Sequence, residues 1–357
     1  MKGLILCAGT GSRLRPMTFS RPKHLLPIMN KPVLFYGIEA MLQAGITEIA
    51  VVVSPVFRKV FDKALQGGAP WNIVISLIEQ PEPKGLADAV RAAEAFTEHD
   101  DFLLYLGDNV IDGSLKPLVE KFQSENLDGV VSVSPVDAPE QFGVVQLCGD
   151  KIEKVVEKPK NPQSNLAING VYLFRHSLFE AISKIVPSPR GEYELTDAIQ
   201  QLIDDRYHLG VFRSPHWWKD TGQPKDLIVC NQYFLQKMNG YSYKGSIDQN
   251  SSVSNPAMIG ENVKIINSVI RGPVIIGENT VVENSYIGPY TSISENVSIY
   301  NCELENSIVM ENTVLDSIPQ RINDSLIGGD VKMIGKSQQP QRLQLLVGDH
   351  SHLYFPL

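Results

Sequence analysis

The sequence predicts an α/β domain with a mostly parallel sheet, followed by a parallel β-helix. Two observations predict this. Up to about residue 240, short apolar runs alternate with segments of helical period, which indicates strands joined by crossover helices. After Gly240 the period changes to six residues with an aliphatic residue in the lead, which is typical of hexapeptide repeats. We therefore expect one domain over residues 1–240 and a second over 241–357.

The elements expected in the first domain follow in chain order. Apolar runs predict strands at 3–8, 48–53, 73–78 and 102–106. Helical patterns occur at 33–44 (closed by Gly45), 85–96, 177–185, 195–206 and 224–239. Between residues 129 and 174, strands come without long helices, which predicts an antiparallel insertion. Right-handed crossovers should cover both faces of the sheet and give three layers.

The second domain is predicted from its repeats. The aliphatic leads are Ile247, Val253, Ile259, Ile265, Ile276, Val282, Ile287, Ile293 and Ile299. The dipeptide Glu-Asn recurs with its Glu at 261, 278, 283, 295, 305 and 311. Asn tolerates a left-handed backbone, so these dipeptides predict the turns between strands. A β-sandwich is the alternative, but a sandwich has no reason to keep a period of six.

Composition narrows the class of protein. The chain has 357 residues, of which 43% are hydrophobic and 20% charged, and its net charge is −8. An acidic chain without a basic block is a poor candidate for binding nucleic acid. The four cysteines are far apart with no C-x-x-C pair, so we expect neither a zinc site nor a disulfide framework. No signal peptide or membrane span is indicated, which predicts a soluble, cytoplasmic protein without membrane partners.

A glycine-rich loop follows the first expected strand. Open α/β sheets bind ligands at this edge, and Gly9 and Gly11 would let backbone N–H groups approach phosphate oxygens. Arg13 and Lys23 can neutralise a polyphosphate. The loop is neither a dinucleotide fingerprint, because Leu14 stands where the third glycine would be, nor a Walker A loop. On these residues alone, a plain strand–helix turn with surface cations remains the alternative.

The longer stretch Leu6–Pro16 resembles the signature of the sugar-1-phosphate nucleotidyltransferases. The resemblance continues, in the family's order, through Gln80–Ala87, Leu106–Asn109, Val156–Pro159 and Trp218–Gly222. It covers the first 240 residues, and the hexapeptide tail is similar to that of the family's two-domain members. The resemblance implies a Rossmann-like nucleotidyltransferase domain and a left-handed β-helix. The chain departs from the signature at Cys7, Ala8 and Ser12, and the methyl group of Ala8 is expected to crowd the nucleotide slightly.

Two aspartates are candidates for a metal site. Asp108 follows an expected strand, and Asp220 follows Trp217-Trp218-Lys219 more than a hundred residues later. Either residue alone would be read as a turn or helix cap. Two carboxylates converging from different strands suit Mg²⁺, which prefers oxygen ligands and keeps several waters. The resemblance implies that both aspartates are metal ligands and that Mg²⁺ is the cofactor.

The resemblance also assigns the substrate-binding residues. The nucleotide-binding residues it implies are Leu6, Ala8, Gly9, Gly11, Arg13, Gln80 and Gly85. The sugar-phosphate-binding residues are Gly143, Glu157, Lys158 and Trp218. The catalytic residues are Arg13, Lys23, Asp108 and Lys158. From the residues alone, Gln80 can belong to a surface loop, Glu157 and Lys158 can form an exposed ion pair, and Trp218 can be core.

The nearest branch is the long-form thymidylyltransferases. It implies transfer of a nucleotidyl group from dTTP to glucose-1-phosphate by Mg²⁺-assisted in-line attack, giving dTDP-glucose and pyrophosphate, in a homo-oligomer. Three alternatives stay open: an enzyme that uses UTP with a sugar-1-phosphate, a non-catalytic regulatory relative, and a bifunctional enzyme whose β-helix transfers an acyl group.

Overall fold

The computed structural model describes residues 1–66 and 71–335, which form two compact units. The first unit comprises Met1–Gly11, Arg21–Leu25 and Val33–Asp220. The second comprises Ser12–Ser20, Leu26–Pro32 and the chain from Thr221 onward. The second unit thus includes residues 221–240 and two N-terminal segments that we expected in the first domain. The C-terminal tail of the expected second domain, residues 336–357, lies outside the described residues.

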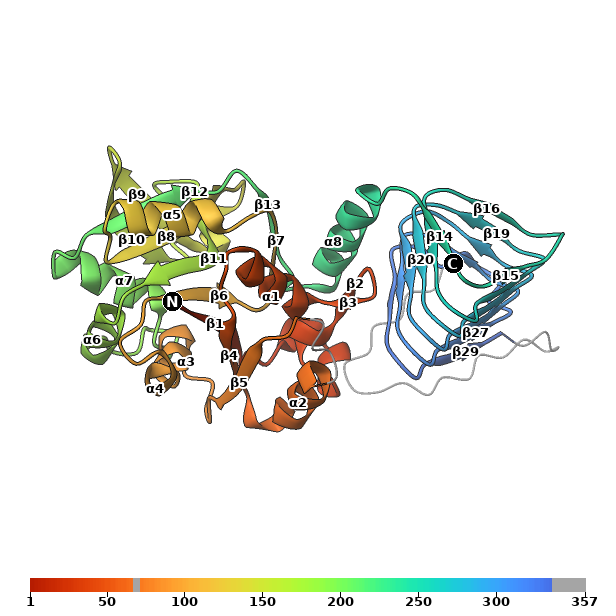
Figure 1. The fold of residues 1–357 in the computed structure, drawn as a ribbon, viewed down its shortest axis with the longest axis horizontal. Helices are drawn as coiled ribbons and strands as arrows, with labels where there is room; N and C mark the ends of the chain where they lie inside the picture. The colour runs from red at the N-terminus through yellow and green to blue at the C-terminus, as the bar shows by residue number, and fades with distance from the viewer. Residues whose placement is uncertain (67–70, 336–357) are drawn as a thin grey trace. The chain divides into compact units, whose positions relative to one another are not determined.

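A nine-stranded mixed sheet is the centre of the first unit (Figure 1). Its strands are β1 (Lys2–Cys7), β4 (Glu48–Val53), β5 (Val74–Glu79), β6 (Phe102–Leu106), β8 (Gly129–Pro135), β9 (Gly143–Cys148), β10 (Lys151–Glu157), β11 (Leu166–Phe174) and β12 (Leu209–Arg213). The main path runs β10-β9-β11-β6-β1-β4-β5, and β8 pairs with β11 and β12. Strands β6, β1, β4 and β5 are parallel, whereas β9, β10 and β11 pair antiparallel with their neighbours. Strand β8 pairs antiparallel with β11 and parallel with β12. The expected parallel sheet with an antiparallel insertion is confirmed.

Helices cover both faces of this sheet. They are α1 (Val33–Gln43), α2 (Arg58–Gln66), α3 (Leu86–Arg91), α4 (Glu94–Thr97), α5 (Lys116–Ser124), α6 (Ser177–Lys184) and α7 (Leu195–Asp204). Leu4 and Leu6 of β1 point into a core with residues of α3, α6 and α7. Ile5 and Cys7 point the other way, into a core with residues of α1, α2 and α5. The alternation of side chains along a strand therefore builds three layers. The helix expected over 85–96 is two helices, because the chain leaves helical geometry at Ala93.

A two-stranded sheet, which the sequence did not predict, lies at the carboxyl end of β6. It pairs β7 (Asn109–Asp112) with β13 (Trp217–Asp220), and the antiparallel register puts Asp220 opposite Asn109. Two stretches of sequence that are about a hundred residues apart therefore lie side by side.

The second unit contains a short hairpin and helix α8 (Pro224–Gln236). The hairpin consists of β2 (Pro27–Ile28) and β3 (Lys31–Pro32). The buried Asn231 of α8 accepts hydrogen bonds from the Met29 backbone N–H at 3.0 Å and the Ser292 hydroxyl at 2.7 Å. Its amide nitrogen donates to the Tyr290 carbonyl at 3.1 Å. One side chain therefore joins the N-terminal hairpin, α8 and the strands that follow.

Short parallel strands form the rest of the second unit. They are β14 (Tyr241–Tyr243), β15 (Ser246–Ile247), β16 (Ser252–Ser254), β17 (Ala257–Ile259), β18 (Lys264–Ile266), β19 (Val269–Arg271), β20 (Val274–Ile276), β21 (Val281–Glu283), β22 (Tyr286–Ile287), β23 (Thr291–Ile293), β24 (Ser298–Tyr300), β25 (Glu303–Leu304), β26 (Ile308–Val309), β27 (Val314–Asp316), β28 (Leu326–Ile327) and β29 (Lys332–Ile334). Through most of the series each strand pairs in parallel with the third strand after it, which builds three sheets. This is a parallel β-helix and not a sandwich. Its left-handed sense stays a prediction.

Asparagines turn the corners of the β-helix. All six residues that follow the recurring Glu have positive φ, between 47° and 58°: Asn262, Asn279, Asn284, Asn296, Asn306 and Asn312. Their side chains also bond from coil to coil. The Asn262 amide donates to Asn279, 17 residues later, at 3.1 Å, and Asn279 donates to Asn296 at 3.3 Å. The expected role of the Glu-Asn dipeptides in turns is confirmed.

Candidate functional site

Lys23 and Asp108 form an ion pair at the carboxyl edge of the first unit's sheet. Lys23 begins the short 3-10 helix Lys23–Leu25, and Asp108 lies two residues after the end of β6. The Lys23 ammonium donates to Oδ2 of Asp108, and the two side chains are only 14% and 18% exposed. Burial acts to raise the pKa of Asp108, but the charges of Lys23 and His24 and the hydrogen bond from Lys23 together outweigh burial and lower that pKa to about 2. Asp108 is therefore a carboxylate.

Asn109 joins Asp108 to Trp218. Its side chain is 3% exposed, and its amide nitrogen donates to Asp108 Oδ1 at 3.0 Å. Its oxygen accepts a hydrogen bond from the Trp218 indole N–H at 2.5 Å. Gly170, at φ 81°, makes room for this amide, because a Cβ there would lie 2.8 Å from the Asn109 nitrogen. The sequence reasoning gave Asn109 no role, although its place directly after Asp108 was a signal.

Asp220 comes to the same edge from β13. It ends that strand and lies opposite Asn109, the residue that follows Asp108. Among the described residues no group of three or more His, Cys, Asp or Glu is arranged to hold a metal ion. Two carboxylates from neighbouring strands nevertheless fit Mg²⁺, because this ion commonly takes one or two protein carboxylates and completes its shell with water and phosphate oxygens.

The glycine-rich loop lies at the end of β1. Leu6 and Ala8 are buried, and Gly9 lies against the Lys23 side chain, close enough that a Cβ would touch it. Gly11 is the last residue of this segment in the first unit. Arg13 belongs to the short 3-10 helix Ser12–Leu14, which is part of the second unit, whereas Lys23 and Asp108 belong to the first.

Gln80 and Gly85 form a second part of the site, on the loop after β5. Gln80 is 5% exposed, so the alternative of a simple surface loop is wrong for its side chain. Its amide nitrogen donates to the Gly85 carbonyl at 3.1 Å and to Asp88 Oδ2 at 2.9 Å. Gly85 has φ 111°, and a Cβ there would lie 2.5 Å from the carbonyl oxygen of Tyr193. Only glycine fits this position.

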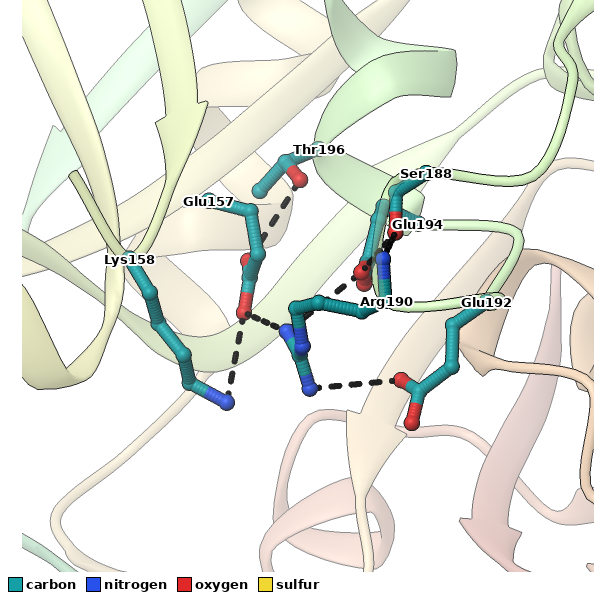
Figure 2. A network of polar contacts seen from close by, with 7 residues as sticks. All are labelled: Glu157, Lys158, Ser188, Arg190, Glu192, Glu194 and Thr196. Carbon is teal, nitrogen blue, oxygen red and sulfur yellow. Dashed lines mark hydrogen bonds and ion pairs between the residues drawn. The ribbon is translucent and has the colours of Figure 1, made fainter.

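A polar network surrounds Glu157 at the end of β10 (Figure 2). Glu157 Oε1 lies 3.5 Å from the Lys158 ammonium and 3.4 Å from the Arg190 guanidinium. Its Oε2 accepts a hydrogen bond from the Thr196 hydroxyl at 3.4 Å. Gly143 pairs with Glu157 across β9 and β10. The structure therefore brings together Gly143, Glu157 and Lys158, which the sequence analysis grouped.

Arg190 is a residue of this network that the sequence reasoning missed. Besides Glu157, its guanidinium meets Glu192 at 3.4 Å and Glu194 at 3.3 Å (Figure 2). Burial raises the pKa of Glu194, although a hydrogen bond from Ser188 opposes this shift. A cation held by three carboxylates from one loop and one strand end has no signature in the sequence.

Trp218 extends from the Asp108 edge toward the residues before Gly143. Its ring packs edge-on against Phe142, with the ring centroids 5.3 Å apart. The Phe142 carbonyl accepts a hydrogen bond from the Lys158 backbone N–H at 3.0 Å. Trp218 therefore lies between the aspartate edge and the Glu157 network.

A sequence profile of the nucleotidyl transferase family matches residues 2–237. The chain belongs to the nucleotidyl transferase family. The match covers all of the described first unit except Met1, including the glycine-rich loop, Asp108, Glu157 and Asp220. The family's members of sugar-1-phosphate type bind a nucleoside triphosphate and a sugar-1-phosphate, and the chain is a nucleotidyltransferase of that type.

Three relatives of this nucleotidyltransferase are informative. The low-salt glycan biosynthesis nucleotidyltransferase Agl11 of Haloferax volcanii is 40% identical over 99% of both chains. The glucose-1-phosphate thymidylyltransferase of Streptomyces antibioticus is 38% identical over 98% of both chains. A crystal structure of a Bacillus anthracis protein assigned as a glucose-1-phosphate thymidylyltransferase, in complex with sucrose, is 33% identical and has a TM-score of 0.63. That match covers 68% of this chain and 98% of the other.

The candidate site is rich in charge despite the negative net charge of the chain. Lys23, Lys158 and Arg190 lie beside carboxylates that hold their positions. Such an arrangement can neutralise phosphate groups without large rearrangement, which is what joining two anions requires.

Among the described residues, no helix is both long and apolar enough to span a bilayer.

Proposed function

We propose that this chain transfers a thymidylyl group from dTTP to glucose-1-phosphate, giving dTDP-glucose and pyrophosphate. The observation that carries the proposal is the 38% identity to the Streptomyces antibioticus glucose-1-phosphate thymidylyltransferase over 98% of both chains. The name of the Haloferax relative specifies neither sugar nor nucleotide, so the assignment of dTTP and glucose-1-phosphate rests on the thymidylyltransferase and on the site.

At the nucleotide end, Leu6, Ala8, Gly9 and Gly11 would line the nucleotide. Arg13 and Lys23 would neutralise the phosphates. Gln80 and the backbone N–H of Gly85 would read the pyrimidine edge. Gln80 suits this role because its buried amide is already fixed by two hydrogen bonds, so little conformational entropy is lost when a base binds.

At the sugar end, Glu157 would bind sugar hydroxyls, and Lys158 would bind the sugar phosphate. The backbone N–H of Gly143 and the Trp218 ring would define the position of the sugar. Support comes from the pairing of Gly143 with Glu157 and from the contact of Trp218 with Phe142. Arg190 adds a second cation beside Glu157.

Asp108 and Asp220 would hold Mg²⁺, which when bound supplies positive charge to the phosphate oxygens. The chain's own residues orient the reactants. A phosphate oxygen of glucose-1-phosphate attacks the α-phosphorus of dTTP in line, the bond to the bridging oxygen breaks, and pyrophosphate leaves. The nucleophile is already an anion, so no covalent enzyme intermediate is needed. Lys23 and Lys158 reduce the repulsion between the two phosphates.

The remaining alternatives make different demands. A regulatory relative would be expected to lose some of Arg13, Lys23, Asp108 or Asp220, and this chain keeps all four.

Hexapeptide acyltransferases commonly use a histidine base, and the sequence has no histidine between Trp218 and Asp349. We therefore expect the β-helix to have no acyltransferase activity. Release of coenzyme A in an assay with glucosamine-1-phosphate as acceptor would contradict this prediction. Homo-oligomerisation stays a prediction that light scattering can test.

The test of the proposal is a panel of dTTP, UTP and CTP, each with glucose-1-phosphate or glucosamine-1-phosphate, measured by pyrophosphate release. We expect the highest kcat/KM for dTTP with glucose-1-phosphate. UTP should be a poorer substrate but still used, because it differs from dTTP by one methyl group and one 2′-hydroxyl, and a methyl group is worth only about 1–3 kcal/mol in a fitted pocket. A higher kcat/KM for UTP than for dTTP would assign the chain as a uridylyltransferase instead.

A further inference from the structure

The side-chain amide of Gln80 has both of its N–H groups engaged. One faces the Gly85 carbonyl at 3.1 Å, and the other faces Asp88 Oδ2 at 2.9 Å. Both partners are acceptors without a hydrogen to donate, so the amide nitrogen must face them and the amide oxygen must face the other way. The chemistry of the neighbours fixes the orientation of Gln80.

Asp88 is itself held in place. Arg91, one turn later on α3, pairs with the other oxygen of the Asp88 carboxylate. The Arg91 guanidinium also lies over the Tyr193 ring, 5.5 Å from its centroid. The Tyr193 backbone carbonyl accepts a hydrogen bond from the Ala87 N–H at 3.1 Å. Helix α3 and the Tyr193 segment therefore form one support behind Gln80.

We propose that Asp88 determines nucleotide specificity by positioning Gln80 as a hydrogen-bond acceptor. The inference rests on the proposed function, in which Gln80 reads the base. With both N–H groups engaged, only the oxygen of Gln80 remains for the base, so the site requires a base with a ring N–H. Asp88 is a positioning residue and does not touch the substrate.

Thymine and uracil satisfy this requirement, and cytosine does not. The N3–H of thymine or uracil donates to the Gln80 oxygen, and their O4 accepts from the Gly85 backbone N–H. Cytosine would present the lone pair of N3 to the Gln80 oxygen, which is also an acceptor. Its amino group at C4 would face the Gly85 N–H, which is also a donor. Unmatched buried groups of this kind are costly.

The Asp88→Asn variant tests the inference because Arg91 controls how the introduced amide would be oriented. A guanidinium only donates, so it takes the oxygen of that amide, and the amino group of the amide then faces Gln80. Gln80 can no longer keep its nitrogen there. We expect the ratio of kcat/KM for dTTP to that for CTP to fall at least about tenfold, which corresponds to one lost buried hydrogen bond. Asp88→Ala, which leaves only the Gly85 contact, should lower the ratio less.

Arg91→Ala supplies the decisive comparison. Alone it keeps the Asp88 carboxylate, so the dTTP to CTP ratio should stay near the wild-type value. In the double variant with Asp88→Asn, the oxygen of the introduced amide is free to turn back to Gln80, so discrimination should be restored. Glu94→Gln is the matched control, because it removes the charge of an exposed side chain three residues after Arg91. Loss of a merely structural contact would not be rescued by removing a second one.

The outcomes separate the inference from the proposed function. A wild type that uses CTP as well as dTTP would contradict both. A selective wild type whose folded Asp88→Asn and Asp88→Ala variants keep the full ratio would contradict the inference alone, as would a double variant no more selective than Asp88→Asn.

Discussion

The indole N–H of Trp218 lies 2.5 Å from the side-chain oxygen of Asn109. The nitrogen of the same amide lies 3.0 Å from a carboxylate oxygen of Asp108. One buried amide therefore sets the distance between a candidate metal ligand and a candidate sugar-binding ring. Asp108 and Trp218 are more than a hundred positions apart in the chain, and both depend on this one amide.

Asn109→Ala should lower kcat at least about tenfold, because Asp108 and Trp218 both lose the partner that orients them. Steady-state pyrophosphate release measures the effect. Asn165→Ala, which removes an exposed amide, is the control and should leave kcat unchanged. An Asn109→Ala enzyme with wild-type kcat would show that the amide is structural only.

Asp108→Asn and Asp220→Asn should each lower turnover at least about 10²-fold while the protein stays folded. Each change removes a formal charge from the proposed Mg²⁺ site and nearly preserves shape. Turnover is measured at saturating Mg²⁺, with the exposed Asp150→Asn as control. Near-normal turnover in either variant rejects that aspartate as a ligand.

His24 should make stability depend on pH. Burial, with Lys23 beside it, lowers the pKa of His24 from 6.5 to about 3. Below pH 6.5 the unfolded chain binds a proton at this position that the folded chain does not. This group therefore lowers the free energy of unfolding by about 1.4 kcal/mol for each unit by which the pH is reduced. Urea unfolding at about pH 7.5 and about pH 5.5 measures this loss.

The comparison variant for this pH effect is His24→Gln, which removes the titrating group and should lose less stability than the wild type over the same interval. The exposed His99→Gln should behave as the wild type does. Equal losses in His24→Gln and the wild type would assign the pH effect to other groups.

Asn231→Leu should destabilise the second unit by roughly 2–4 kcal/mol, because it leaves the Met29 N–H, the Ser292 hydroxyl and the Tyr290 carbonyl without this partner. Urea unfolding followed by circular dichroism measures the effect. The exposed Asn250→Ala should change stability by less than about 0.5 kcal/mol. A similar small effect for Asn231→Leu would mean that water replaces the amide.

Much of the fold was predictable because buried strands are continuous apolar runs. Strands β4 and β6 lie at the expected residues, and Ile259, Ile276 and Ile293 fill the interior of the β-helix as the period implied. The sheet of β7 and β13 was not predictable. Each of its strands has only four residues, and its pairing partner is about a hundred residues away. Local pattern carries no information on such a contact.

The candidate site also contains residues that the sequence predicted and residues that only the structure shows. Asp108 and Glu157 stand at strand ends within recognisable motifs, so the sequence located them. Asn109, Asp88 and Arg190 act through contacts with residues from other segments, and polar side chains of this kind are usually solvated. Only the folded structure shows that Asn109 is buried and that Arg190 meets three carboxylates.

The hairpin and the segment Ser12–Ser20 belong to the unit that contains the β-helix, although they precede nearly all of the nucleotidyltransferase sheet in the chain. No single cut therefore separates the two units. A gene fragment ending near residue 240 would carry Asn30 without the Ile293 carbonyl to which its amide donates at 2.6 Å. The β-helix is not an interchangeable module that recombination can replace at one junction. Any exchange of it must also match residues encoded in the first tenth of the gene.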